Sequence, residues 1–166
     1  MRHLRVLVVS LLLASTSLLL LAQEKKFLLG SGLTYCSDVH HPGINASLTF
    51  KLVGELHAGP DFSVLLTTET MDDGSQVKRK ELEYNFNVHY LFDIANAIKA
   101  YPLAGLNVSK ITVHPEGDLA AKKWVKALNA GAGLEYEWKK FRLFAEFKYV
   151  YQLRKYDVTS GILFPL

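Results

Sequence analysis

The chain has 166 residues, of which 49% are hydrophobic and 21% are charged, with 19 Lys and Arg against 16 Asp and Glu. This near balance of charge gives no indication of a nucleic-acid partner. Because Cys36 is the one cysteine in the sequence, an internal disulfide is excluded.

The N-terminus has the pattern of a secretory signal peptide. Arg2 and Arg5 give a basic start, residues 6–22 form an apolar run, and a charged segment follows at 23–26. We expect cleavage after Ala22, which makes 1–22 the signal peptide and 23–166 the mature domain. The alternative is an uncleaved anchor helix, because the run approaches the lower limit of about 17 residues for a membrane span. Subtracting the two arginines from the 19 basic residues leaves 17 against 16 acidic ones, so the mature chain is near neutral.

Alternation of apolar and polar residues with period two recurs through the mature chain and predicts β-strands. In chain order, the predicted strands cover 27–35, 45–57, 62–69, 81–92, 99–113, 127–138, 141–151 and 156–166. The segment 118–127 also fits one or two helical turns, but we interpret it as a loop and the start of a strand. About eight strands of this length predict an all-β fold, a closed antiparallel up-and-down transmembrane β-barrel.

The breaks between the strands form two alternating sets. Short turns are predicted at 59–61, 93–98 and 139–140, and longer connections at 36–43, 71–76, 114–122 and 152–155. With both termini in the periplasm, the short set lies on the periplasmic side and the long set outside. A hairpin at 139–140 predicts that Trp138 faces Phe141, that Leu134 faces Ala145 and that Gly133 faces Glu146.

The direction of the two faces is the decisive question, because the same alternation fits a soluble barrel with the faces exchanged. Gly30, Gly32, Gly131 and Gly133 fall on the polar face, which suits a narrow interior. Aromatic residues gather near both rims, as in the girdles of membrane barrels. We therefore expect the apolar face to contact lipid. The predicted girdle beside the short turns consists of Tyr90, Phe92, Tyr101, Tyr136, Trp138 and Phe141.

Several segments resemble the outer-membrane β-barrel domain family of small porin-like proteins. The most specific are Gly133-Leu-Glu-Tyr136 and Phe144-Ala-Glu-Phe-Lys-Tyr149; 27–35, 101–107 and 161–164 are weaker. The resemblance implies a monomer in the outer membrane of a Gram-negative bacterium, in contact with outer-membrane lipid and with the barrel insertion machinery during biogenesis. In that family a terminal aromatic residue aids insertion, and Pro165-Leu166 after Phe164 depart from this pattern. The segment after the signal is similar to exported proteins of Bacteroides-type bacteria.

The polar face carries charged residues that we expect to fill the lumen as a network of ion pairs. An eight-stranded barrel is just wide enough for side chains to fill it, and buried charges require partners. The alternatives are paired catalytic acids or a small-solute channel. A lipid-modifying site is disfavoured, because Ser109 and His114 lie on opposite faces of one strand. The predicted lumen charge network consists of Lys51, Glu55, Glu81, Glu83, His89, Glu135, Glu137, Arg142, Glu146 and Lys148.

The first long connection contains residue types that bind soft metals, namely Cys36, Asp38, His40 and His41. No second ligand cluster at a defined spacing supports a site, so we predict no metal, no cofactor and no catalytic residue. The expected function is non-enzymatic: a structural, envelope-stabilising or surface-interaction role with a lumen closed by charges. The competing function is that of a soluble exported β-barrel that binds an apolar ligand.

Overall fold

The protein was analysed as a computed structural model, which describes residues 27–38, 41–70, 76–115 and 120–166. The expected signal peptide, 1–22, lies outside the described residues. In the described part of the chain, no helix combines the length and the hydropathy that crossing a membrane requires.

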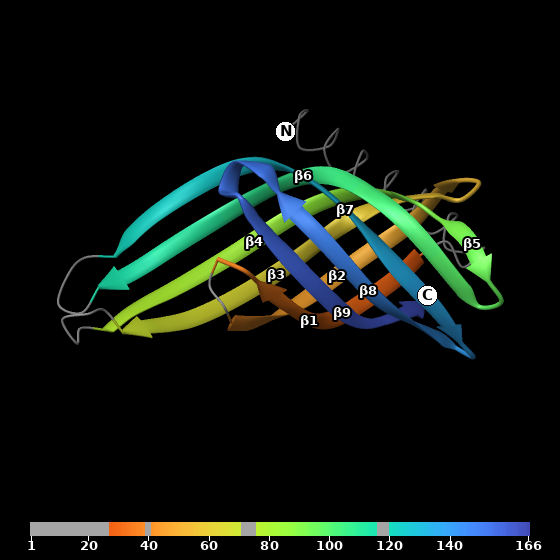
Figure 1. Ribbon diagram of the computed structural model, residues 1–166, viewed down its shortest axis with the longest axis horizontal. Helices are drawn as coiled ribbons and strands as arrows, with labels where there is room; N and C mark the ends of the chain where they lie inside the picture. Colours follow the sequence, from red (N-terminus) through yellow and green to blue (C-terminus); the bar gives the residue numbers. More distant parts are fainter. Residues whose placement is uncertain (1–26, 39–40, 71–75, 116–119) are drawn as a thin grey trace, which may run out of the picture.

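The described residues form one antiparallel sheet that closes on itself (Figure 1). The short strand β5 continues β4 beyond Leu91, and β4 pairs with β6, so the sheet becomes a closed barrel of eight strands. This arrangement confirms the predicted fold class. The strands are β1 (Phe27–Cys36), β2 (His41–Val53), β3 (Leu56–Thr70), β4 (Gln76–Tyr90), β5 (Phe92–Ala95), β6 (Ile98–Pro115), β7 (Ala121–Trp138), β8 (Phe141–Val150) and β9 (Lys155–Pro165), with a short 3₁₀ turn, η2 (Tyr151–Leu153), between the last two.

The connection between β2 and β3 differs from the prediction. The chain turns at Gly54, whose φ is 56°, rather than at 59–61. Pro60 instead lies within β3, opposite Phe86 of β4. The pairing between β2 and β3 has a gap at Pro60, which has no N–H to donate. Because the alternation continues through Pro60, the next residue, Asp61, faces the interior.

The hairpin of β7 and β8 agrees with the predicted register. Trp138 pairs with Phe141, Leu134 with Ala145 and Gly133 with Glu146. The two-residue turn is made by Lys139, in the left-handed region at φ 53°, and Lys140. Strand β7 begins at residue 121, which confirms that 118–127 contains the start of a strand.

The barrel has a tall wall and a short wall. Strands β6 and β7 have 18 residues each, whereas β1 and β8 have 10 each. In Figure 1, β3, β4, β6 and β7 extend to the left beyond the ends of β1 and β9. We call the end with the tight turns at residues 54–55, 96–97 and 139–140 the turn end, and the opposite end the loop end.

Candidate functional site

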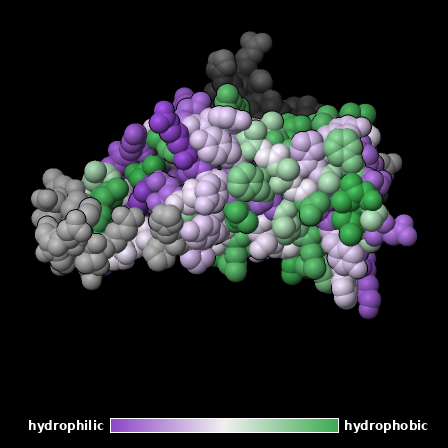
Figure 2. All heavy atoms as spheres, in the orientation of Figure 1, coloured by the Kyte–Doolittle hydropathy of each residue, from purple (hydrophilic) through white to green (hydrophobic). Residues whose placement is uncertain are grey.

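The two faces of the strands have the orientation of a membrane barrel. Phe86, Leu134 and Phe147 are 47%, 50% and 49% exposed on the outer surface. Glu83 and Glu135 are 1% and 3% exposed in the interior. Figure 2 shows hydrophobic residues over much of the turn-end half of the visible face. A water-soluble barrel would show the reverse distribution.

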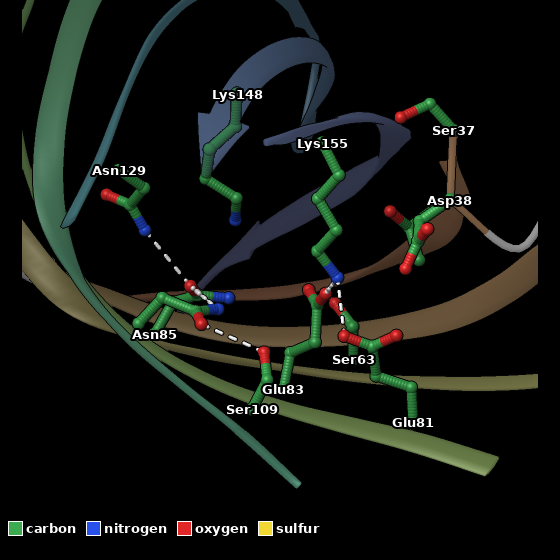
Figure 3. A network of polar contacts seen from close by, with 12 residues as sticks. Ser37, Asp38, Ser63, Glu81, Glu83, Asn85, Ser109, Asn129, Lys148 and Lys155 are labelled. Carbon is green, nitrogen blue, oxygen red and sulfur yellow. Dashed lines mark hydrogen bonds and ion pairs between the residues drawn. The ribbon is translucent and has the colours of Figure 1, made fainter. Parts of the chain in front are cut away.

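A cluster of ion pairs lies in the lumen near the loop end. The ammonium group of Lys155 lies 2.6 Å from a carboxylate oxygen of Glu81 and also contacts Glu83 (Figure 3). The guanidinium group of Arg79 binds Glu81 at 3.2 Å and reaches Asp38 in the connection after β1. This cluster joins β4 to β9 across the lumen.

The residues of the first connection do not gather around one point in the described part of the chain. Asp38 pairs with Arg79. Cys36 is fully buried, and its sulfur lies within 4.8 Å of carboxylate oxygens of Glu83 and Asp157. His40 and the side chain of His41 lie outside the described residues. Because Lys155 already contacts Glu83, a cationic side chain lies beside this thiol and its carboxylates.

Asp61 is the centre of the middle layer of the lumen. Its carboxylate accepts hydrogen bonds from the side-chain amides of Asn85 at 2.8 Å and Asn87 at 2.5 Å. The ammonium group of Lys148, on the opposite wall, lies 3.3 Å away. Lys148 is 87 positions from Asp61 in sequence, so the pair connects β3 directly to β8.

Neutral amides extend this layer around the wall. The side-chain oxygen of Asn85 accepts hydrogen bonds from Asn107 at 2.8 Å and Asn129 at 3.0 Å. The hydroxyl of Ser109 donates to the side-chain oxygen of Asn107 at 2.9 Å. The charged pairs therefore lie next to a hydrogen-bonded belt on β4, β6 and β7, as a buried polar interior requires.

The assignment of Tyr101 to the outer aromatic girdle was wrong. Its side chain points into the lumen and is 3% exposed. Its ring stacks on His89 with a centroid distance of 5.0 Å, and its hydroxyl donates to Glu146 at 3.3 Å. A Cβ at Gly133, its partner on β7, would lie 2.3 Å from the ring. The absence of that Cβ lets the ring cover the glycine, as aromatic residues do in other sheets.

The other predicted girdle residues lie at the turn end, outside the lumen. Tyr90 and Phe92 form an aromatic pair at 4.9 Å, and Tyr136 and Trp138 another at 5.9 Å. All four are exposed to at least 39%. Phe141 is half-buried.

At the turn end, the remaining charges of the predicted network lie at the lumen mouth. Arg142 binds Glu135 at 3.0 Å and Glu137 at 2.9 Å. Lys51 and Glu55 pair at 3.6 Å, with side chains 42% and 41% exposed, so they are on the rim. The predicted network thus spans the barrel, with its most buried members in the middle and at the loop end.

Sequence reasoning missed five charged residues that face the lumen, namely Asp61, Arg79, Lys99, Lys155 and Asp157. Asp61 was left out of the predicted network because Gly59-Pro60 resembles a turn. Lys155 was assigned to a loop, although it and Asp157 have the same parity as the buried Thr159 of β9. Asp157 already lay within the predicted strand 156–166, and extending that strand by one residue would have included Lys155.

Little free space remains among these side chains. An interior cavity bordered by Asp61, His89, Tyr101 and Glu146 has a volume of about 30 Å³. That volume suits about one water molecule. An apolar ligand of ordinary size does not fit there.

An apolar exterior, a polar interior and eight closed antiparallel strands together define the fold of a small outer-membrane β-barrel. Solved structures share this fold. Ail, the attachment invasion locus protein of Yersinia pestis, in complex with the heparin analogue sucrose octasulfate, is 14% identical with a TM-score of 0.57, covering 83% of this chain and 94% of Ail. Neisserial surface protein A is 15% identical with a TM-score of 0.61, covering 84% and 97%.

A de novo designed transmembrane β-barrel matches at 14% identity and a TM-score of 0.53, covering 86% of this chain and 96% of the design. At these identities the likeness shows the fold alone. No protein-family profile and no curated protein matches the sequence. The two natural proteins named above come from Yersinia and Neisseria, and they give the expected Bacteroides-type origin no support.

Proposed function

We propose that this protein is a non-enzymatic, monomeric barrel of the Gram-negative outer membrane, with a lumen closed by charges and a structural, envelope-stabilising or surface-interaction role. Its loop end faces outward and its turn end faces the periplasm. The observation that supports this most is the inverted burial of the strands, with Phe86, Leu134 and Phe147 outside and Glu83 and Glu135 inside.

The outer surface favours lipid over water as its solvent. Apolar area in water costs about 25 cal/mol per Å², whereas acyl chains accept it without that cost. Contiguous apolar surface on a water-soluble protein is normally small. The interior cavity of about 30 Å³ also argues against a soluble carrier of an apolar ligand.

A structural lumen is favoured over a conducting or catalytic one. The pair of Lys148 and Asp61 crosses the middle of the barrel, and the pairs of Lys155 with Glu81 and Glu83 cross it nearer the loop end. Ser109 is fully buried and donates to Asn107, whereas His114 is exposed on the outer face. This serine and histidine therefore offer no nucleophile–base pair.

A role at the cell surface has support from the structural neighbours. One of them is described as an attachment invasion locus protein and another as a surface protein. Both share the fold with this chain over more than four fifths of its length. We extend a surface-interaction role to this chain as part of the proposal.

The membrane assignment is tested on a detergent gel with boiled and unboiled samples of the membrane fraction. A folded barrel resists the detergent until heated, so the two samples should differ in mobility. Recovery of the protein in the aqueous periplasmic fraction, with no mobility change, would contradict the assignment.

The closed lumen is tested separately in planar bilayers. The purified protein should give no stepwise conductance, because ion pairs occupy the lumen from the loop end to the middle. The matched variant is the double substitution Asp61→Ser with Lys148→Ser, which removes one pair while keeping the lumen neutral. Regular conductance steps from the wild-type protein would refute the closed lumen, whatever the variant does.

A further inference from the structure

The outer face of the barrel carries a cluster of lysines near the loop end, which the proposed function leaves unexplained. Strand alternation places these side chains on the same face as Tyr84 and Phe86, opposite to the buried Glu81 and Glu83. Figure 2 shows hydrophilic residues over the loop-end part of β6 and β7. We call this cluster the lysine face; it consists of Lys78, Lys80, Lys110, Lys122 and Lys126.

The register brings these lysines together across three strands. Lys80 of β4 and Lys122 of β7 both pair with Thr112 of β6, so the three residues lie in one row. Neighbouring strands are about 4.8 Å apart, which places the two lysines about 10 Å from each other along the row. Lys78 pairs with His114 in the next row. The spacing suits an anion that contacts two cations at once.

No carboxylate of the described residues pairs with the lysine face. The acids of the same part of β4, Glu81 and Glu83, point into the lumen, where they bind Lys155 and Arg79. Lys110 lies over the ring of Trp124, 5.3 Å from its centroid. The described residues of the lysine face therefore present positive charge to the surroundings, which attracts an external anion.

Two aromatic residues lie among the lysines: Trp124 pairs with Lys110, and Tyr84 shares a row with Lys126 through Val108. Tyr84 and Trp124 stack at a centroid distance of 6.5 Å and are both exposed on the outer surface. Aromatic side chains of membrane barrels lie at the boundary between acyl chains and headgroups. Each membrane strand needs about 9–11 residues, so the 18 residues of β6 and β7 extend past this boundary at the loop end. Lys110 and Lys126 lie level with the aromatic residues, and Lys78, Lys80 and Lys122 lie further toward the loop end, at the level of lipid phosphates.

The surface beside the lysines is hollowed and has mixed character. A groove of about 490 Å³ is bordered by Lys78, Lys80 and His114 together with Leu66 and Thr68 of β3. Leu66 is 61% exposed. Because Leu66 pairs with Lys80, a cation lies beside an exposed leucine, which matches a ligand that has both a phosphate and a hydrocarbon chain.

From these observations we infer that the lysine face binds the phosphate groups of a phosphorylated glycolipid in the outer leaflet. This inference rests on the proposed function, because it requires the loop end to face outward in an outer membrane. Binding on one wall would fix the rotational orientation of the barrel among its lipids. It would also tie the protein to the outer leaflet and so contribute to envelope stability.

The test compares two double variants of the full mature protein in phosphatidylcholine nanodiscs containing a small fraction of lipid A, a bisphosphorylated glycolipid. Native mass spectrometry measures how much lipid A each barrel retains. Lys80→Gln with Lys122→Gln removes two cations of the lysine face. The matched control, Lys139→Gln with Lys140→Gln, removes two lysines at the turn end.

Wild type and control should retain lipid A equally. A lysine near a membrane surface contributes about fivefold to the binding of an anion, so the lysine-face variant should bind about 25-fold more weakly. Dephosphorylated lipid A should show no preference between the variants. Equal retention of lipid A by both double variants would overturn the inference, as would wild-type protein that retains dephosphorylated lipid A as well as it retains lipid A.

Two further arms separate the possible failures. If soluble polyphosphate binds the lysine face in detergent while lipid A does not, the ligand is a soluble polyanion and the lipid assignment is overturned. Each sample is also checked for heat-dependent mobility on a detergent gel. A barrel that shows heat-dependent mobility but does not retain lipid A contradicts this inference only. A chain that stays in the aqueous fraction contradicts the proposed function itself.

Discussion

The lumen and the outer surface are formed by alternate residues of the same strands, yet they use different means of stabilisation. On β7, Gly131 faces Lys148 across the inner wall, and its neighbour Ala132 faces Phe147 on the outer wall. Inside, each side chain has little space and its charge needs a partner. Outside, lipid adapts to the shape of the protein. The comparison teaches that inner positions are restricted in both volume and charge, whereas outer positions are restricted only in polarity.

The largest expected effect comes from removing a buried cation. In Lys155→Met, two carboxylates that are 0% and 1% exposed, those of Glu81 and Glu83, lose this partner. Breaking a buried ion pair typically costs about 3–5 kcal/mol. Denaturant-induced unfolding in phospholipid vesicles should show a loss of that size, while Lys139→Met at the exposed turn should leave the midpoint unchanged. A loss equal to that of the control would mean that the loop-end cluster does not hold the lumen together.

The second-largest loss of stability should come from placing a charged side chain on the outer surface. Leu134→Arg places a charge among acyl chains and should cost about 2–4 kcal/mol if the residue lies near the middle of the membrane. Leu134→Phe keeps the surface apolar and is the control. Vesicle unfolding measures both variants. If arginine and phenylalanine are tolerated equally, the outer face does not contact lipid.

The smallest expected effects come from added side-chain volume, which should be tolerated on the outer face but not on the inner face. A Cβ at Gly131 would lie 1.9 Å from the backbone oxygen of Phe147, so Gly131→Ala forces the strands to shift. We expect a loss of about 1–3 kcal/mol, the usual range for overpacking. Ala132→Leu adds more volume on the lipid side and should change stability little. An unfolding series in which Ala132→Leu is the more harmful would reverse the assignment of the faces.

Much of the fold could be predicted because strand alternation is a local signal. The eight strands and the register of the β7–β8 hairpin follow from period two and one tight turn. Pro60 misled the prediction because a proline after glycine is typical of turns, and only the gap in its pairing with β2 accommodates it in a strand. Tyr101 was assigned to the girdle because it lies near a rim, although the alternation along β6 places its side chain inside.

The partners inside the lumen could not be predicted from local patterns. Lys155 meets Glu81 across 74 positions of sequence, and Tyr101 meets Glu146 across 45. Such pairs depend on how far each strand is staggered relative to the next when the barrel closes. The alternation along each strand predicts which side chains point inward. The offset between neighbouring strands decides which of these side chains contact one another.

The pairing of β1 with β9 has a consequence for how the protein matures. Most neighbouring strands in this barrel are joined by short hairpins, whereas this seam pairs residues that are far apart in sequence, such as Thr34 and Thr159, 125 positions apart. Before the seam forms, the sheet has two unpaired edges, which invite pairing with other chains. Closure must therefore await the arrival of β9, and until then both edges stay open to pairing with other chains.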